Sequence, residues 1–325
     1  MASRIKTMPA PAKTTGMVKI TKGIYAYIGG NGTTDFGLVL TNDKPVVIDN
    51  DIRVRKQFLA GMKKVTKKDA GLLLNTHHNF DHTSDNGYYI GKGAVSFGVD
   101  LVREEMEREY ASGNWVKQMA GRQPSVDRFI GKLGITPPTV TFEEQIDIRY
   151  GGRLFQMIYI DHCHTKGDTV VWMPEEGVLF TGNLITYRTH PVNRLGNFNN
   201  WLPALEVLNK FPAKYIVPGH GPLPPKGSKV IHENKTYLAR LKSRTEAALK
   251  KHKSPAKAAT AVEMPEYTKW FRAPNVADTA LKMANDLRSK RSHAQGETRH
   301  AENVSFAGQT ARFRRVYTST SEAGG

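Results

Sequence analysis

Short runs of apolar residues, bounded by glycine, asparagine and aspartate, recur along most of the chain and predict β-strands. These strands are expected at 24–28, 36–40, 45–49, 70–76, 139–142, 146–149, 155–160, 169–173, 178–181 and 215–218. Apolar residues at helical spacing predict helices at 54–65, 99–132, 201–210, 232–252 and 275–288. Because strands and helices alternate in the first half and again in the second, we expect two similar layers that meet at one core.

The two ends of the chain lack this periodicity. Residues 1–17 are rich in lysine, proline, threonine and alanine and are expected to form a flexible arm. Residues 289–325 are polar and basic and are expected to form a mobile tail. The folded catalytic domain is therefore expected at 18–288, and 325 residues that are 39% hydrophobic suffice to bury a core.

Several features bear on where the protein works. No apolar run approaches the roughly 20 residues that span a bilayer, and the first residues lack the apolar stretch of a secretory signal. We therefore expect a cytoplasmic protein without a membrane partner. The single cysteine, Cys163, excludes an intrachain disulfide and any site that needs several cysteines. Any metal must be held by histidine, carboxylate or amide groups.

The chain carries 47 Lys and Arg against 30 Asp and Glu, a net charge of +17. Most of this excess lies after Lys226, where basic residues alternate with apolar residues at helical spacing. We interpret this pattern as the solvated face of a surface helix, so nucleic-acid binding is not the expected role.

Four polar segments follow or end predicted strands, where α/β sheets usually present catalytic groups. They are Thr-His-His-Asn-Phe-Asp-His at 76–82, His-Cys-His-Thr-Lys-Gly-Asp at 162–168, Phe-Thr-Gly-Asn at 180–183 and Pro-Gly-His-Gly at 218–221. Three histidines and an aspartate within six residues are unusual, and three further sites at strand ends make coincidence a poor explanation.

Over about residues 18–288 these segments resemble the metallo-β-lactamase fold superfamily. That family has a His-x-His-x-Asp-His pattern, a Gly-His-Thr-x-Gly-Asp-like segment, a Thr-Gly-Asp turn and a Gly-His-Gly end. The positions that match its ligands are His77, Asp81, His82, His164 and His220. The resemblance implies an α/β fold, the four-layer αββα sandwich with two sheets inside and helices outside.

Two departures from the family pattern change the metal site that is expected. Asn79 stands where the family has its second histidine, and Asn183 stands where it has a bridging aspartate. The first metal site would keep only His77 and His164, whereas catalytic zinc usually has three protein ligands. The second site keeps its ligands, namely Asp81, His82, His220 and the amide oxygen of Asn183. We therefore expect one zinc ion per active site; binding of two metals through Asn79, or of iron or manganese, stays open.

The resemblance also implies roles for the remaining residues. A metal-bound hydroxide would attack the substrate, with His77, Asn79 and His164 as catalytic groups that accept protons or orient the nucleophile. Asp49 and Asp168 are interpreted as supports for loops and imidazoles. Cys163 is expected to point away from the metal.

The ligand set is most similar to that of the chlorothalonil hydrolytic dehalogenase branch, single-zinc enzymes that replace an aryl chloride with hydroxide. An aromatic small-molecule substrate would then be held by aromatic walls, for which the candidates are Trp115, Tyr187, Phe198 and Trp201. Three alternatives remain: a zinc hydrolase of a small ester, lactone or thioester, a two-metal nuclease, and a non-catalytic binding protein with the same fold. Apolar residues at 99–132 and in the helix from 275 suggest a homodimer.

Overall fold

The computed structural model describes residues 16–29, 34–117, 134–193 and 195–296, with the side chains of 116, 117 and 290–296 left out. Most of the predicted arm, residues 1–15, and most of the predicted tail, residues 297–325, lie outside this part. The first described strand, β1, begins at Gly16, and the last described helix, α10, continues to Gly296.

The larger sheet has seven strands in sequential order, β1 to β7. The first four pair antiparallel, and β4 to β7 pair parallel. The strands are β1 (Gly16–Thr21), β2 (Ile24–Ile28), β3 (Phe36–Val39), β4 (Val46–Ile48), β5 (Leu72–Leu74), β6 (Val95–Val99) and β7 (Val140–Phe142).

The smaller sheet has five strands in the order β12-β11-β10-β9-β8. All its pairs are antiparallel except β11 with β12. The strands are β8 (Gln145–Tyr150), β9 (Arg153–Asp161), β10 (Asp168–Met173), β11 (Val178–Phe180) and β12 (Tyr215–Val217). Every residue of β10 and β11 is buried, which explains why they are continuous apolar runs rather than alternating ones.

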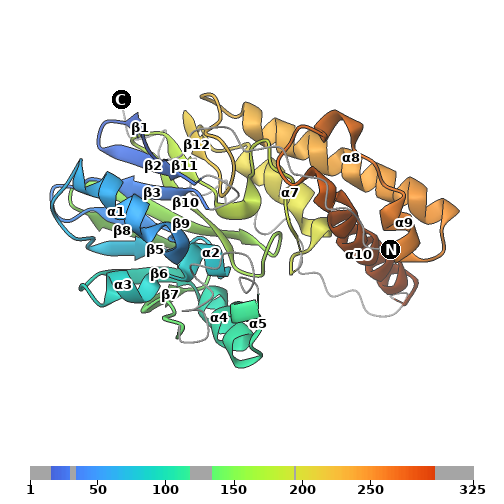
Figure 1. The fold of residues 1–325 in the computed structure, drawn as a ribbon, viewed down its shortest axis with the longest axis horizontal. Helices are drawn as coiled ribbons and strands as arrows, with labels where there is room; N and C mark the ends of the chain where they lie inside the picture. Colours follow the sequence, from blue (N-terminus) through green and yellow to red (C-terminus); the bar gives the residue numbers. More distant parts are fainter. Residues whose placement is uncertain (1–15, 30–33, 118–133, 194, 297–325) are drawn as a thin grey trace, which may run out of the picture.

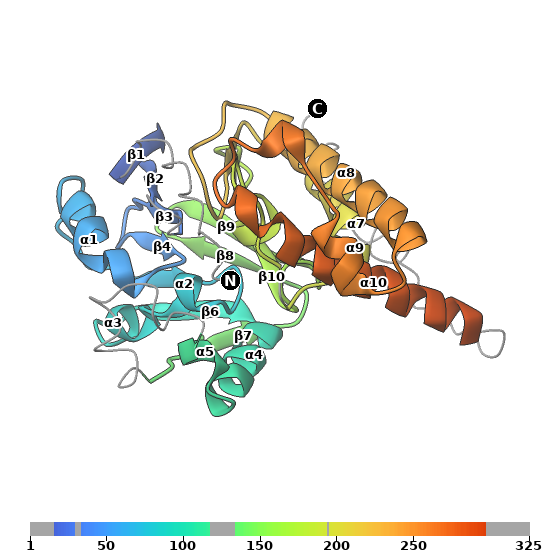
Figure 2. The same ribbon diagram turned by 45° about the vertical axis from the view of Figure 1, so that its right-hand side comes forward.

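Helices cover the outer face of each sheet (Figures 1 and 2). Beside the larger sheet lie α1 (Arg55–Lys63), α2 (Phe80–Thr83), α3 (Asn86–Ile90), α4 (Asp100–Ala111) and α5 (Asn114–Lys117). Beside the smaller sheet lie α7 (Phe198–Leu208), α8 (Lys229–Lys251), α9 (Pro255–Thr260) and α10 (Val276–Gly296). Short 3₁₀ turns are η1 (Ile52–Val54), η2 (Gly182–Leu184), η3 (Pro265–Tyr267) and η4 (Ala273–Asn275).

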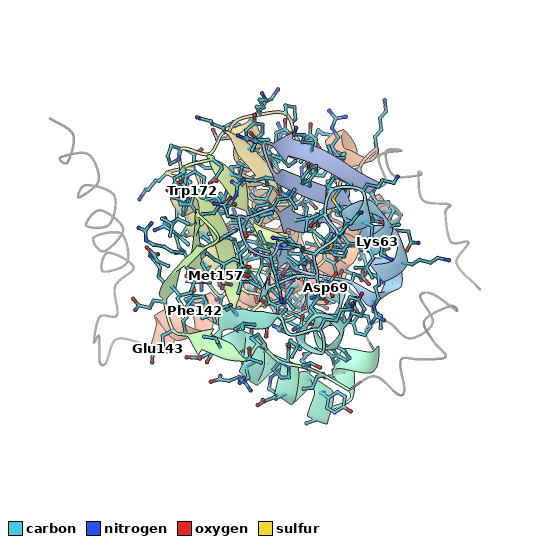
Figure 3. All side chains as sticks on the ribbon, turned by 90° about the vertical axis from the view of Figure 1, so that its left-hand side faces the viewer. Lys63, Asp69, Phe142, Glu143, Met157 and Trp172 are labelled. Atoms are coloured by element: carbon cyan, nitrogen blue, oxygen red, sulfur yellow. The ribbon has the colours of Figure 1, made fainter. Side chains whose placement is uncertain are left out.

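Three main apolar cores hold these four layers together. One lies between the sheets, one between the larger sheet and α1 and α3, and one between the smaller sheet and α7 to α10. Met157 on β9 and Trp172 on β10, both labelled in Figure 3, contribute to different cores, the inter-sheet core and the core under the helices respectively. The αββα sandwich expected from the sequence is confirmed.

The prediction of one long helix at 99–132 is wrong for its described part. Residues 95–99 form a strand, and α4 begins only at Asp100. The helix ends at Ala111 because Gly113 has a φ of +69°, a left-handed conformation typical of the residue after a helix. Residues 118–133 lie outside the described part. No helix in the described residues is long and apolar enough to cross a membrane.

Candidate metal centre

The four polar segments found in the sequence converge at one end of the two sheets. Residues 75–82 lead from β5 into α2, and residues 162–167 connect β9 with β10. Asn183 lies in η2 after β11, and His220 follows β12. In the larger sheet β4 and β5 are parallel and end at the same edge, and in the smaller sheet the same holds for β11 and β12. The side chains that follow these strands therefore share one site.

Asp81, His82 and His220 form the strongest candidate for a metal site. Their ligand atoms all lie within 4.8 Å of one another. The His220 Nε2 atom is 3.4 Å from Asp81 Oδ2. His82 Nε2 is buried without a hydrogen-bond partner among the described residues, which is the state expected of a ligand atom. Although burial raises the pKa of Asp81, the neighbouring His82, His220 and Arg53 lower it below its usual value, so the carboxylate is ionised.

Asp49 forms hydrogen bonds with one member of this ligand set and with the segment that precedes it. It accepts hydrogen bonds from the Thr76 amide at 2.8 Å, from Thr76 Oγ1 at 2.7 Å and from His82 Nδ1 at 2.9 Å. Since His82 Nδ1 donates its proton to Asp49, the lone pair of the neutral ring lies on Nε2, which faces the metal position.

The Asp49 carboxylate is also connected to His77, through a hydrogen-bond chain that passes over the Thr76 hydroxyl. Thr76 Oγ1 donates to Asp49 and lies 3.0 Å from His77 Nδ1, so it can accept the Nδ1 proton. His77 Nε2 is then an acceptor, and it is buried without a described partner. Burial, together with the neighbouring His82 and His164, lowers the pKa of His77 well below its usual value, so the ring is neutral at pH 7.

These contacts also explain a second group of close ligand atoms, from Asp49, His77 and His82. The oxygens of Asp49 already accept three hydrogen bonds, and the proximity of the three residues follows from that network. Asp81, His82 and His220 fit a metal better, because the Asp49 carboxylate of the other group is already occupied by Thr76 and by the Nδ1 atom of His82, whereas the Nε2 atom of His82 is buried without a described partner.

Asn79, His164 and Asn183 form a compact group beside these ligands. His164 Nε2 lies 2.8 Å from Asn79 Nδ2 and 3.0 Å from Asn183 Nδ2. Burial, next to His82, lowers the pKa of His164 to about 3, so this ring is also neutral. The nitrogen that would bind a first metal therefore meets two amide groups.

The other amide atom of Asn183 has a different environment. Its Oδ1 is buried without a described partner. A Cβ on Gly219 would lie 2.1 Å from that oxygen, so glycine is required next to His220 for the amide to fit. Asn183 can thus direct its oxygen towards a metal while its nitrogen contacts His164.

Asp168 lies behind the loop that carries His164. Its Oδ2 accepts from the amide of His164, from the Thr165 amide at 3.0 Å and from the Cys163 amide at 3.3 Å. This geometry agrees with a loop-supporting role. Burial raises the pKa of the Cys163 thiol well above its usual value, so the thiol is not ionised.

The four aromatic residues expected to line the substrate site are all buried. Trp115, Phe198, Trp201 and Tyr187 expose 1%, 3%, 1% and 7% of their surface. Trp201 comes nearest to the predicted chemistry, with its ring 5.9 Å from that of His164, and Phe198 stacks on Trp201. Trp115 packs on Phe80, and the amide of Tyr187 donates to the His220 carbonyl at 3.0 Å. In this structure all four are core residues, and none presents an open aromatic face.

Two arginines near the site were not found from the sequence. Arg53 pairs with Asp51 and lies 3.8 Å from Asp81 Oδ2. Arg272 contributes to the lowered pKa of both Asp81 and His164. Arg53 comes four residues after the predicted strand at 45–49 but lies outside the four polar segments, and Arg272 follows no predicted strand, so neither was singled out.

Comparison with known proteins identifies the family of this chain. The model of the metallo-beta-lactamase superfamily matches residues 29–220. A Bacillus cereus metallo-beta-lactamase type 2 is 23% identical over 211 residues, 62% of this chain and 72% of the relative. A Bacteroides fragilis metallo-beta-lactamase type 2 is 32% identical, but over only 27% of this chain and 37% of the relative.

Solved structures show the same fold at low identity. A metallo-beta-lactamase family protein from Thermus thermophilus aligns with a TM-score of 0.63 and 16% identity, over 84% of this chain and 95% of that one. The sec-alkylsulfatase Pisa1 from Pseudomonas sp. aligns with a TM-score of 0.62 and 15% identity, over 84% of this chain and 50% of that one. This chain belongs to the metallo-beta-lactamase superfamily, and its fold and candidate ligands point to a metal-dependent hydrolase.

Proposed function

We propose that this protein is a hydrolase with one zinc ion per active site, held by Asp81, His82 and His220 with the amide oxygen of Asn183. The observation that carries the proposal is the contact of two amide groups with His164 Nε2, at 2.8 Å from Asn79 and 3.0 Å from Asn183. A neutral imidazole has one lone pair, and these amide donors compete for it with a first metal ion. The first site thus lacks a histidine at position 79, and its remaining histidine, His164, already contacts two amide groups.

The donor set of the other site suits one divalent ion. A bound zinc ion would lower the pKa of its water and stabilise negative charge that develops on the substrate. Asp81 would offset part of the metal charge, and Asp49 holds His82 in the tautomer that ligates through Nε2. Arg53, at 3.8 Å, limits the orientations available to the Asp81 carboxylate.

His77 is the best candidate for moving a proton. Its Nδ1 is hydrogen-bonded to Thr76, and its Nε2 is a buried acceptor. Because burial and the neighbouring imidazoles keep the ring neutral at pH 7, Nε2 can accept a hydrogen bond from the nucleophile. His164 is less suited to this role because its Nε2 already meets both amides, and we assign it the orientation of Asn79 and Asn183.

We further propose hydrolytic dehalogenation of a chlorinated aromatic as the specific reaction. This proposal rests on the sequence resemblance of the ligand set, and the neutral Asn79 and Asn183 support it because they favour a single metal. In this reaction water supplies the hydroxyl group, the aryl–chlorine bond breaks and chloride leaves with a proton released to solvent. Stoichiometric release of chloride from a polychlorinated aromatic dinitrile, in proportion to bound zinc, is the expected result.

A second candidate is hydrolysis of a small ester, lactone or thioester. The relatives named metallo-beta-lactamases favour it, because they align over 62% to 65% of the chain and their name implies cleavage of a cyclic acyl compound. A panel of small esters and lactones separates the two reactions. Hydrolysis of the panel without chloride release from the dinitrile would favour acyl hydrolysis and contradict the dehalogenase assignment.

The single-metal proposal is tested by elemental analysis of protein purified without added metal. We expect about one zinc per chain in the wild type, its loss in His220→Ala and weaker binding in Asn183→Ala. His232→Ala is the matched control, since His232 is an exposed histidine on α8. Two metals per chain would refute the proposal, and absence of metal would favour the non-catalytic binding protein.

A further inference from the structure

We propose that Asn75 is a positioning residue for the adjacent ligands Asp81 and His82. Its side-chain amide holds the main chain of His82 as part of a buried network of three asparagines, Asn50, Asn75 and Asn86. The proposal rests on the proposed zinc site for its effect on metal binding, whereas its effect on the ligand segment is tested without metal. None of the three asparagines was a candidate from the sequence.

The short helix that carries both ligands depends on contacts from outside. Helix α2 has only four residues, Phe80–Thr83, and a single turn is not stable by itself (Figure 1). The His82 amide donates to the Asn79 carbonyl at 2.8 Å within this turn. The His82 carbonyl has no amide four residues further along the same helix, because α2 ends at Thr83. This carbonyl therefore needs hydrogen-bond donors from other parts of the fold.

Two asparagines at strand ends of the larger sheet supply these donors. The Asn50 main-chain amide donates to the His82 carbonyl at 3.1 Å, and Asn75 Nδ2 donates to it at 3.2 Å. Asn75 is itself fixed by the sheet, because its main-chain amide donates to the Phe97 carbonyl of β6 at 2.9 Å. Asn50 follows Asp49, whose carboxylate holds Nδ1 of the same histidine. The ring and the main chain of His82 are therefore both held by residues that follow β4 and β5.

The third asparagine, Asn86, connects the side chains of the other two. Asn50 Nδ2 donates to Asn86 Oδ1 at 2.7 Å, and Asn86 Nδ2 donates to Asn75 Oδ1 at 2.8 Å. Asn75 Nδ2 also lies 3.2 Å from Asn86 Oδ1. All three residues expose 1% or less of their surface. Because the network is buried, its donors and acceptors must be paired within the protein.

Main-chain groups at both ends of the network fix the direction of every amide. The Asp85 amide donates to Asn50 Oδ1 at 2.6 Å, so Asn50 turns its nitrogen towards Asn86. The Thr136 carbonyl accepts from Asn86 Nδ2 at 2.9 Å, so the oxygen of Asn86 faces the other two asparagines. Asn75 then presents its oxygen to Asn86 and its nitrogen to the carbonyl of the ligand histidine. A carboxylate at position 75 would place an acceptor against that carbonyl, so the network requires an amide there.

The first test compares Asn75→Asp with the wild type, because this substitution keeps the shape of the side chain and removes its donor. We expect zinc affinity, measured on the full chain by competition with a chelator, to fall about tenfold or more. The absorption spectrum of the cobalt-loaded protein should also change, since it reports how the ligands are arranged around the metal. Asn75→Ser, which is smaller and keeps a donor, should lose less affinity, and it replaces Asn75→Asp if that variant does not fold.

Leu241→Ala is the control for a loss of stability alone. Leu241 is fully buried on α8 in the core under the helices, and its apolar side chain donates no hydrogen bond to a ligand. Truncation of such a residue destabilises the fold, but it should leave zinc affinity and the cobalt spectrum as in the wild type. Unchanged affinity and spectrum in the Asn75 variants would overturn the proposal, and so would equal changes in Leu241→Ala.

Hydrogen exchange of the metal-free protein separates this proposal from the proposed function. In Asn75→Asp we expect faster amide exchange over residues 79–84 than in the wild type, because the His82 carbonyl has lost a donor that holds this turn. If the wild type binds no zinc, the proposed function is wrong, and faster exchange limited to this segment still supports the positioning role of Asn75. Equal exchange of this segment in the two proteins would overturn that role.

Discussion

Replacing Asp49 with asparagine is expected to weaken zinc binding without touching a ligand. The substitution suits the backbone, because φ at this position is +60° and asparagine tolerates the left-handed region. Asp49 accepts from the Thr76 amide, Thr76 Oγ1 and His82 Nδ1 at 2.8, 2.7 and 2.9 Å. In asparagine an NH₂ group replaces one of the two carboxylate oxygens. This NH₂ group must therefore face a hydrogen-bond donor that the carboxylate oxygen accepted from.

Each orientation of the new amide has a defined cost. If its nitrogen faces His82, the ring must accept at Nδ1, and Nε2 then carries the proton and cannot ligate. If its nitrogen faces the Thr76 amide, one buried donor loses its partner, which costs about 1–3 kcal/mol of unfolding free energy. Changes of this kind behind a ligating histidine typically reduce metal affinity about 10- to 100-fold, or about 1.4–2.7 kcal/mol.

The assay is competition between the protein and a chelator of known zinc affinity, with the denaturant stability of the metal-free protein measured in parallel. Asp69→Asn is the control, since Asp69 is exposed and pairs only with Lys92 among the described contacts, at 3.0 Å. Unchanged zinc affinity in Asp49→Asn would refute the argument that this carboxylate selects the ligating tautomer of His82.

Two further results are expected. The double variant Asn79→His with Asn183→Asp should bind about two metals per chain instead of about one, because it restores a third ligand and a bridging carboxylate. If elemental analysis of this variant still finds one metal, the two asparagines are not what excludes the first metal. In the metal-free protein His78 alone should account for a loss of about 3 kcal/mol of stability as the pH falls from 6.5 to 4, because burial lowers its pKa from 6.5 to about 4 against the raising effect of Glu105, so that at this histidine only the unfolded chain gains a proton in this range. His77 and His164, whose pKa values burial also lowers, add losses of the same sign. Denaturant unfolding should show a weaker pH dependence in His78→Leu than in the exposed control His232→Leu, and equal slopes would exclude His78 as the source.

Much of the fold could be predicted because the apolar runs are short and clearly bounded. The strand at 24–28 has the same limits in the structure, and β10 and β11 differ from the prediction by one residue at one end. The strand β6 was missed because Val95–Val99 merges without a turn residue into the polar-apolar pattern of α4. Helix α7 starts at Phe198 and not at Trp201, because Asn197 accepts a hydrogen bond from the Asn199 amide and caps it.

The candidate site was predictable to the extent that its residues follow strands. That position singled out the four polar segments, and the resemblance to the family grouped Asp81, His82 and His220, whose ligand atoms lie within 4.8 Å of one another. The aromatic walls were harder to predict because an aromatic residue in a helix looks the same whether it lines a site or fills a core; Trp201 at 1% exposure fills a core. Which of these residues contacts a substrate stays a prediction.

The sequence by itself determined the two-sheet architecture, the strand ends that carry the chemistry and the identity of Asn79 and Asn183, because these depend on local hydrophobic pattern and on residue type. Only the tertiary structure decided that both asparagines contact His164 and that Asp49 selects the tautomer of His82. These contacts join residues between 19 and 85 positions apart, so no local pattern in the sequence brings them together. Such contacts are set by how the layers pack, and packing is a property of the whole chain.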